Sequence, residues 1–73
     1  MQEIEFKLNA EYVELNQLLK LVGVCDSGGA GKALVATGEV SVDGHIELRK
    51  TCKVRTGSLV TLGDVRIKIC NSD

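Results

Sequence analysis

The chain has 73 residues, a formal net charge of −1 and 44% hydrophobic residues, which suits one small globular domain spanning residues 1–73. One Tyr, one Phe and no Trp exclude a nucleic-acid platform built from several stacked aromatic rings. No apolar run approaches the roughly 18 residues of a membrane helix. The N-terminal Met1-Gln2-Glu3 has no apolar signal region, so a cytoplasmic protein without a membrane partner is expected.

The first two elements are predicted from apolar periodicity. Alternation over residues 4–8 indicates a strand, and Asn9 is expected to cap a helix of about three turns that ends at Gly23. The apolar residues of this helix recur at i, i+3, i+4 and i+7 on one face: Leu15, Leu18, Leu19 and Val22.

A second helix and four further strands follow. Asp26 or Ser27 is expected to cap this helix, whose apolar side carries Ala30, Leu34 and Val35 and which stops at Gly38. Two hairpins are predicted around Asp43-Gly44 and around Gly63-Asp64, joining strands over residues 39–42 with 45–48 and 59–62 with 65–69. The order β-α-α-β-β-β-β predicts an α+β domain, with two helices on a small, mostly antiparallel sheet.

The glycine-rich residues 28–32 do not match a phosphate-binding loop of nucleotide triphosphatases. That motif would need Gly at position 26 and Ser or Thr at position 33, where the chain has Asp26 and Ala33. Three glycines in one helix are unfavourable, because each is about 1 kcal/mol worse than alanine there. Three explanations remain open: close approach of a phosphate to the helix N-terminus, a frayed first turn, or tight packing of the two helices.

Seven residues, 49–55, hold four cations and no acidic residue: Arg49, Lys50, Lys53 and Arg55. Such a run can be a solvated strand edge that discourages aggregation, or a set of phosphate contacts.

The sequence offers few residues that could form a catalytic or metal-binding site. The wide spacing of Cys25, Cys52 and Cys70 fits no zinc knuckle, and His45 is expected to be exposed beside a turn. We therefore expect no metal and no cofactor.

The spacing of a longer set of residues resembles a known family. The set reads Leu15-(x₃)-Leu19-(x₃)-Gly23-(x₃)-Ser27, then Leu34-Val35-(x₂)-Gly38-x-Val40-x-Val42-Asp43-Gly44, then Lys53-Val54-x-x-Gly57. It resembles the αL RNA-binding domain named for ribosomal small-subunit protein four, and in particular its small stand-alone YbcJ-like members. The resemblance covers residues 15–62 and implies RNA binding by the second helix and the segment after the hairpin. The residues that it places on family positions are Ser27, Lys32, Arg49, Lys50 and Lys53.

The resulting hypothesis is a bacterial, non-enzymatic and monomeric RNA-binding protein. Arg55 and Lys20 are added as further phosphate contacts, and the expected partner is structured RNA such as ribosomal or transfer RNA. The alternative is a protein-interaction adaptor, with the ribosome as one candidate platform, that docks through the bare glycine-rich helix face and the acidic N-terminal end. An enzyme has little support, because no catalytic set accompanies the domain.

Overall fold

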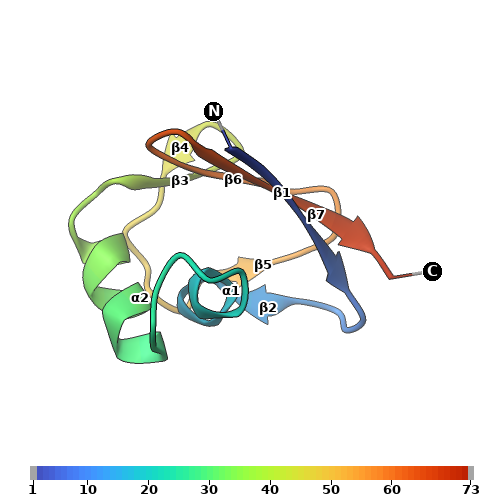
Figure 1. Cartoon of the computed structure of the whole chain (residues 1–73), viewed down its shortest axis with the longest axis horizontal. Helices are drawn as coiled ribbons and strands as arrows, with labels where there is room; N and C mark the ends of the chain where they lie inside the picture. Colours follow the sequence, from blue (N-terminus) through green and yellow to red (C-terminus); the bar gives the residue numbers. More distant parts are fainter. Residues whose placement is uncertain (1, 73) are drawn as a thin grey trace.

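The computed structural model describes residues 2–72 and has two layers, a five-stranded sheet and two helices on one of its faces (Figure 1). In chain order the elements are β1 Gln2–Leu8, β2 Val13–Glu14, α1 Leu15–Leu21, α2 Gly28–Ala36, β3 Val40–Val42, β4 His45–Ile46, β5 Lys53–Val54, β6 Leu59–Leu62 and β7 Val65–Asn71. The predicted α+β class and mostly antiparallel sheet are confirmed. The end residues of the domain expected over 1–73 lie outside the described part.

The first and last strands lie side by side in the sheet, whose order is β1-β7-β6-β3-β4 (Figure 1). β1 pairs with β7 in parallel, from Gln2↔Val65 to Leu8↔Asn71, whereas the other pairs of this sheet are antiparallel. The short strands β2 and β5, which the sequence did not predict, form a separate antiparallel ladder beside α1. This ladder brings residues 13–14 against residues 53–54.

The core lies between the helices and the sheet. The predicted α1 stripe is confirmed, because Leu15, Leu18 and Leu19 are fully buried and Val22 packs against them. The sheet and the rest of the chain contribute the other core residues: Leu8, Val35, Val40, Val54, Val60, Ile67 and Ile69. Alternation along β7 leaves the Arg66 and Lys68 side chains on its exposed face.

The predicted start of the first helix is wrong. Asn9 does not cap it: α1 begins at Leu15, with Glu14 as an N-cap whose side chain makes no capping hydrogen bond. Residues 13–14 are held as a strand by β5, and helix formation starts only beyond them. The helix has seven residues rather than about three turns, but it ends as predicted, with Gly23 in the left-handed region at φ +85°.

The packing of α2 explains why one of its glycines, Gly31, is needed. Of the two expected caps, Asp26 and Ser27, Ser27 is the N-cap, and its Oγ accepts a hydrogen bond from the N–H of Ala30 at 3.1 Å. A Cβ on Gly31 would lie 2.5 Å from the backbone oxygen of Asn16 in α1. The tight-packing explanation is therefore confirmed at Gly31. Ala30, predicted on the apolar side, is instead exposed.

Candidate functional site

The basic segment, defined as residues 49–55, lies against the first turn of α1. The N–H of Leu15 donates to the backbone oxygen of Cys52 at 2.9 Å, and the N–H of Asn16 donates to that of Lys50 at 3.1 Å. The first N–H groups of a helix have no acceptor within the helix. Here carbonyls of the basic segment accept from two of them, which fixes the segment beside α1 in place of a side-chain cap.

The first half of α2 also packs against the first turn of α1, on its other side. Gly31 packs on the backbone of Asn16, the residue that also holds Lys50. Ser27 satisfies the N–H groups of Ala30 and Gly31 through its Oγ and backbone oxygen. The N–H groups of Gly28 and Gly29 thus remain at the start of a helix, where the helix dipole favours an anion.

Asn16 occupies the centre of this junction and is 1% exposed, yet its Oδ1 has no hydrogen-bond partner. A buried acceptor without a partner destabilises a fold by about 1–3 kcal/mol. The junction between α1, α2 and the basic segment therefore contains both a backbone contact that only glycine permits and a buried amide oxygen without a partner.

Arg49 is paired with an acid that lies just outside the basic segment. Its Nε donates to Glu47 Oε2 at 3.0 Å and its Nη2 to Oε1 at 3.2 Å, and its backbone N–H also donates to Oε2. The Glu47 side chain is 17% exposed and that of Arg49 is 78% exposed. The cationic run is thus compensated at one of its four charges, which reduces the pull of Arg49 on a phosphate.

The same contact lowers the pKa of the Glu47 carboxyl to about 2, chiefly through the side-chain hydrogen bond from Arg49 and then through the Arg49 backbone N–H. In the unfolded chain a glutamate has a pKa of ~4.3, so the contact with Arg49 stabilises the fold above pH ~4.3. This stabilisation is lost as the pH falls to about 2, where the Glu47 carboxyl of the folded protein is protonated. We expect the urea midpoint of the wild type to fall more steeply than that of Glu47→Gln between about pH 5 and about pH 2. Parallel curves in circular dichroism would show that the ion pair does not persist in solution.

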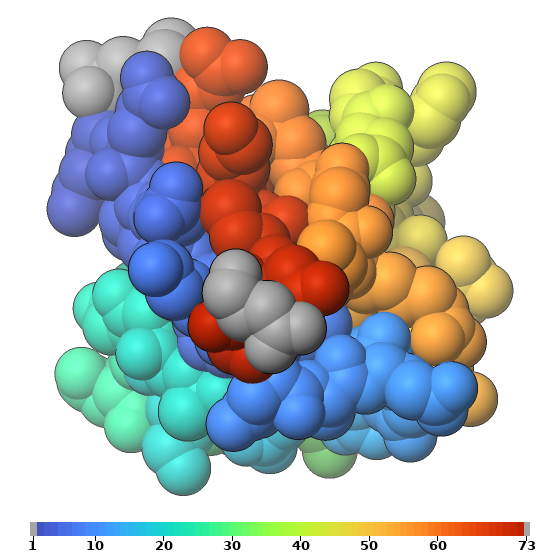
Figure 2. Space-filling view, turned by 90° about the vertical axis from the view of Figure 1, so that its right-hand side faces the viewer, coloured from blue at the N-terminus to red at the C-terminus, as the bar shows by residue number. Residues whose placement is uncertain are grey.

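Lys53 and Arg55 share a face with Tyr12, which the sequence analysis missed. The Lys53 Nζ lies 5.0 Å and the Arg55 Cζ 5.6 Å from the centre of the Tyr12 ring. Figure 2 shows the segment around residues 10–13 in light blue beside the orange segment around residues 53–56. The sequence pattern does not indicate a role for Tyr12, because it predicts a helix start over residues 9–14 and not a strand.

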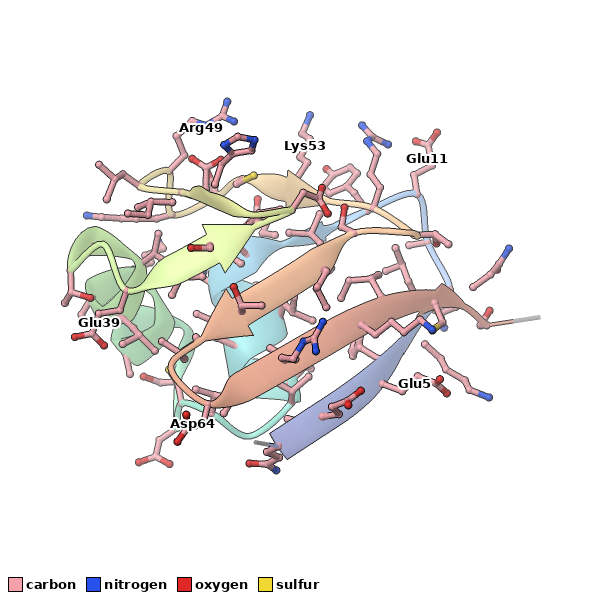
Figure 3. All side chains as sticks on the ribbon, turned by 90° about the horizontal axis from the view of Figure 1, so that it is seen from above. Glu5, Glu11, Glu39, Arg49, Lys53 and Asp64 are labelled. Atoms are coloured by element: carbon pink, nitrogen blue, oxygen red, sulfur yellow. The ribbon has the colours of Figure 1, made fainter. Side chains whose placement is uncertain are left out.

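Figure 3 places Arg49, Lys53 and Glu11 along one edge of the molecule, with Glu5 and Asp64 on the opposite side. Arg49, Thr51, Cys52 and Lys53 line a surface hollow of about 430 Å³. The other predicted contact residues, Lys20, Ser27, Lys32, Lys50 and Arg55, are also exposed.

Cys52 contributes its backbone oxygen to this junction, and no phosphate contact is assigned to the His45 imidazole or to the thiols. His45 is exposed in β4, as predicted. Cys25, Cys52 and Cys70 are free thiols, and burial raises the pKa of Cys25 and Cys52. Within residues 2–72, no three His, Cys, Asp or Glu side chains gather as metal ligands, and no helix has the length and apolar character to cross a membrane.

Comparison with known families agrees with this geometry. The model of the S4 domain matches residues 6–70, which is most of the chain. The chain belongs to the S4 domain family. The matched range contains β2, both helices and the basic segment, so every element of the junction lies inside the S4 domain.

Two relatives of this S4 domain are 41% identical to it over 58 residues, covering 80% of the chain and 83% of each relative. They are the Escherichia coli (strain K12) protein named "Putative RNA-binding protein YbcJ" and the Shigella flexneri protein named "Uncharacterized protein YbcJ". The solution structure of E. coli YbcJ superposes with a TM-score of 0.68 and 36% identity, over 96% of this chain and 87% of that one. That structure is described as revealing an αL motif involved in RNA binding.

Proposed function

We propose that this S4 domain binds structured RNA through its phosphates and shape, without a catalytic step. Lys50, Lys53 and Arg55 of the basic segment contact the backbone on one side of the junction. Lys32, Ser27 and the free N–H groups at the start of α2 contact it on the other. RNA binding is attributed to the E. coli relative by its name and by the description of its structure.

The observation that carries the proposal is the double role of Asn16. Its N–H donates a hydrogen bond to the backbone oxygen of Lys50, and its own backbone oxygen packs against Gly31. The basic segment and the start of α2 therefore lie on two sides of one residue. Cations and helix N–H groups are the groups that contact phosphates. Double-stranded RNA offers its phosphates and 2′-hydroxyls to a protein, since its deep groove is too narrow for side chains.

Within this proposal, Arg49 and Lys20 are weaker contacts. Glu47 neutralises much of the Arg49 charge, although the guanidinium stays exposed. Lys20 lies in the last turn of α1, at the end of that helix away from the basic segment. We therefore assign four phosphate contacts, to Lys32, Lys50, Lys53 and Arg55.

Four contacts predict a steep dependence of affinity on salt. The slope of log K against log salt is about −0.7 to −0.9 per contact, so we expect a slope of about −2.8 to −3.6. Binding should weaken about 50- to 150-fold between ~50 and ~200 mM salt. A filter-binding series with a short hairpin RNA measures this slope, and a flat response would refute phosphate recognition.

The alternative, a protein-interaction adaptor, is favoured by one observation, at a different surface from the glycine-rich helix face expected from the sequence. Ile46 and Leu48 are 66% and 60% exposed; Ile46 ends β4, and Leu48 follows it by two residues. Large apolar side chains exposed close together are typical of protein contacts. Partners captured by this surface would remain bound after nuclease treatment, whereas partners held through RNA would be released.

A further inference from the structure

Tyr12 lies on the outer face of the β2–β5 ladder, together with two cations. In this ladder Val13 pairs with Val54 and Glu14 with Lys53. Val54 is buried in the core, and Val13 packs against it. Because side chains alternate between the faces of a strand, the neighbours of these valines point outward. The exposed face therefore carries Tyr12 beside Lys53 and Arg55, and also Glu14, the cross-strand partner of Lys53.

In this group two cations lie over the ring of Tyr12. The two charges lie 5.0 and 5.6 Å from the ring centre, within the range of cation–π attraction. An N–H of the Arg55 guanidinium also reaches the backbone oxygen of Glu11 at 3.5 Å. Tyr12 as a whole nevertheless keeps 38% of its surface exposed. An oriented aromatic side chain with accessible surface and adjacent positive charge suits a ligand that is both flat and anionic.

We propose that Tyr12, flanked by Lys53 and Arg55, stacks against one unpaired nucleobase of the bound RNA. The proposal rests on the proposed function, because Lys53 belongs both to the phosphate contacts and to this cluster. A strand whose phosphate meets Lys53 would pass next to the ring. One ring serves one base, which agrees with the near absence of aromatic residues in the chain.

Stacking of this kind would give the protein a preference that phosphate contacts cannot supply. Base–aromatic stacking contributes about 5- to 150-fold to affinity for each base. Phosphate contacts alone do not distinguish a blunt stem from a stem with an unpaired extension of equal charge. The preferred target is therefore a stem next to a loop, bulge or single-stranded end.

The test uses three short RNA hairpins: a blunt stem, the same stem with a few unpaired nucleotides, and the same stem with an abasic extension. The abasic extension adds the same phosphates without bases. We expect the wild type to bind the nucleotide extension at least about fivefold more tightly than the abasic one. Tyr12→Leu should lose this difference and keep its affinity for the blunt stem, while Tyr12→Phe should keep the difference.

Fluorescence gives an independent readout, because Tyr12 is the one tyrosine of the chain and there is no tryptophan. A base stacked on the ring should quench this emission with the nucleotide extension and not with the abasic extension. Circular dichroism checks that both variants are folded.

The outcomes separate the two proposals. If no hairpin is bound, the proposed function fails. If the blunt stem is bound but the extension gives neither tighter binding nor quenching, stacking is refuted while phosphate recognition stands. If Tyr12→Leu weakens the blunt stem as much as the extended one, the ring only supports the β2–β5 ladder and stacking is refuted as well. Quenching by an acidic peptide and by no RNA would assign the surface to a protein partner instead.

Discussion

The double variant Lys50→Glu with Lys53→Glu is expected to bind structured RNA roughly 150-fold more weakly than the wild type. Each lysine is assigned one phosphate contact, and a hydrogen bond to a charged group contributes about 1.5–3 kcal/mol. Losing two such contacts removes at least about 3 kcal/mol, and the introduced carboxylates add repulsion. The slope of log K against log salt should also become shallower by about 1.4 to 1.8, which is about 0.7 to 0.9 for each contact removed. Filter binding to a hairpin RNA at several salt concentrations measures both quantities.

A charge-matched control separates a local site from overall charge. Lys7→Glu with Lys68→Glu makes the same change in net charge at two exposed lysines on β1 and β7. Glu5, the cross-strand neighbour of Lys68, lies across the molecule from Lys53 and Arg49 (Figure 3). We expect this control to bind nearly as tightly as the wild type at physiological salt, where screening acts over about 8 Å. Equal losses in both variants would argue against a site in the basic segment.

Gly31→Ala is expected to destabilise the fold by about 2 kcal/mol. The new Cβ would lie 2.5 Å from the backbone oxygen of Asn16, which cannot swing away as a side chain could. The helices must separate, and overpacking of this kind costs up to about 3 kcal/mol, against a gain of about 1 kcal/mol in helix propensity. In a domain of this size the loss lowers the melting temperature by roughly 8 to 16 °C. Urea and thermal unfolding followed by circular dichroism measure it.

Gly29→Ala provides the matched control within the same helix. Gly29 is exposed, and the nearest atom to a Cβ there is Ser27 Oγ at 3.9 Å, an ordinary contact. This variant should gain up to about 1 kcal/mol, because alanine favours the helix and meets no obstacle. If both variants gained stability, the close approach of α1 and α2 would not exist in solution.

Gly31 and Gly29 also differ in the reason for which α2 contains them, which is helix packing for Gly31 and, in the proposed function, anion binding for Gly29. Gly31 is required by the contact with Asn16 and lies away from solvent. Gly29 has no packing reason of its own, and it supplies one of the free N–H groups assigned to phosphate. The helix therefore contains Gly31 for a structural reason on its buried face, and we propose phosphate binding as the reason for Gly29 on its exposed face.

Local patterns in the sequence were sufficient for much of the fold. The stripe of Leu15, Leu18 and Leu19, the Ser27 cap and the Asp43-Gly44 turn follow from residues only a few positions apart. Asp43 and Gly44 both take positive φ, 53° and 86°, as the predicted hairpin turn requires. Periodicity, capping and turn chemistry act over one or two turns of chain, so the sequence alone determined these elements and the α+β class that they imply.

Tertiary structure decided the start of α1 and the make-up of the candidate site. Two-residue strands have no periodic signal, so the pairing of Val13 with Val54 was invisible in the sequence, and with it the later start of α1 and the place of Tyr12. The charge of Arg49 was countable, but its neutralisation by Glu47 depends on the backbone path of the loop that joins them. Composition and short-range patterns thus determined which cations and aromatic rings the chain has for binding. Contacts between distant segments determined which of these side chains lie together on one exposed surface.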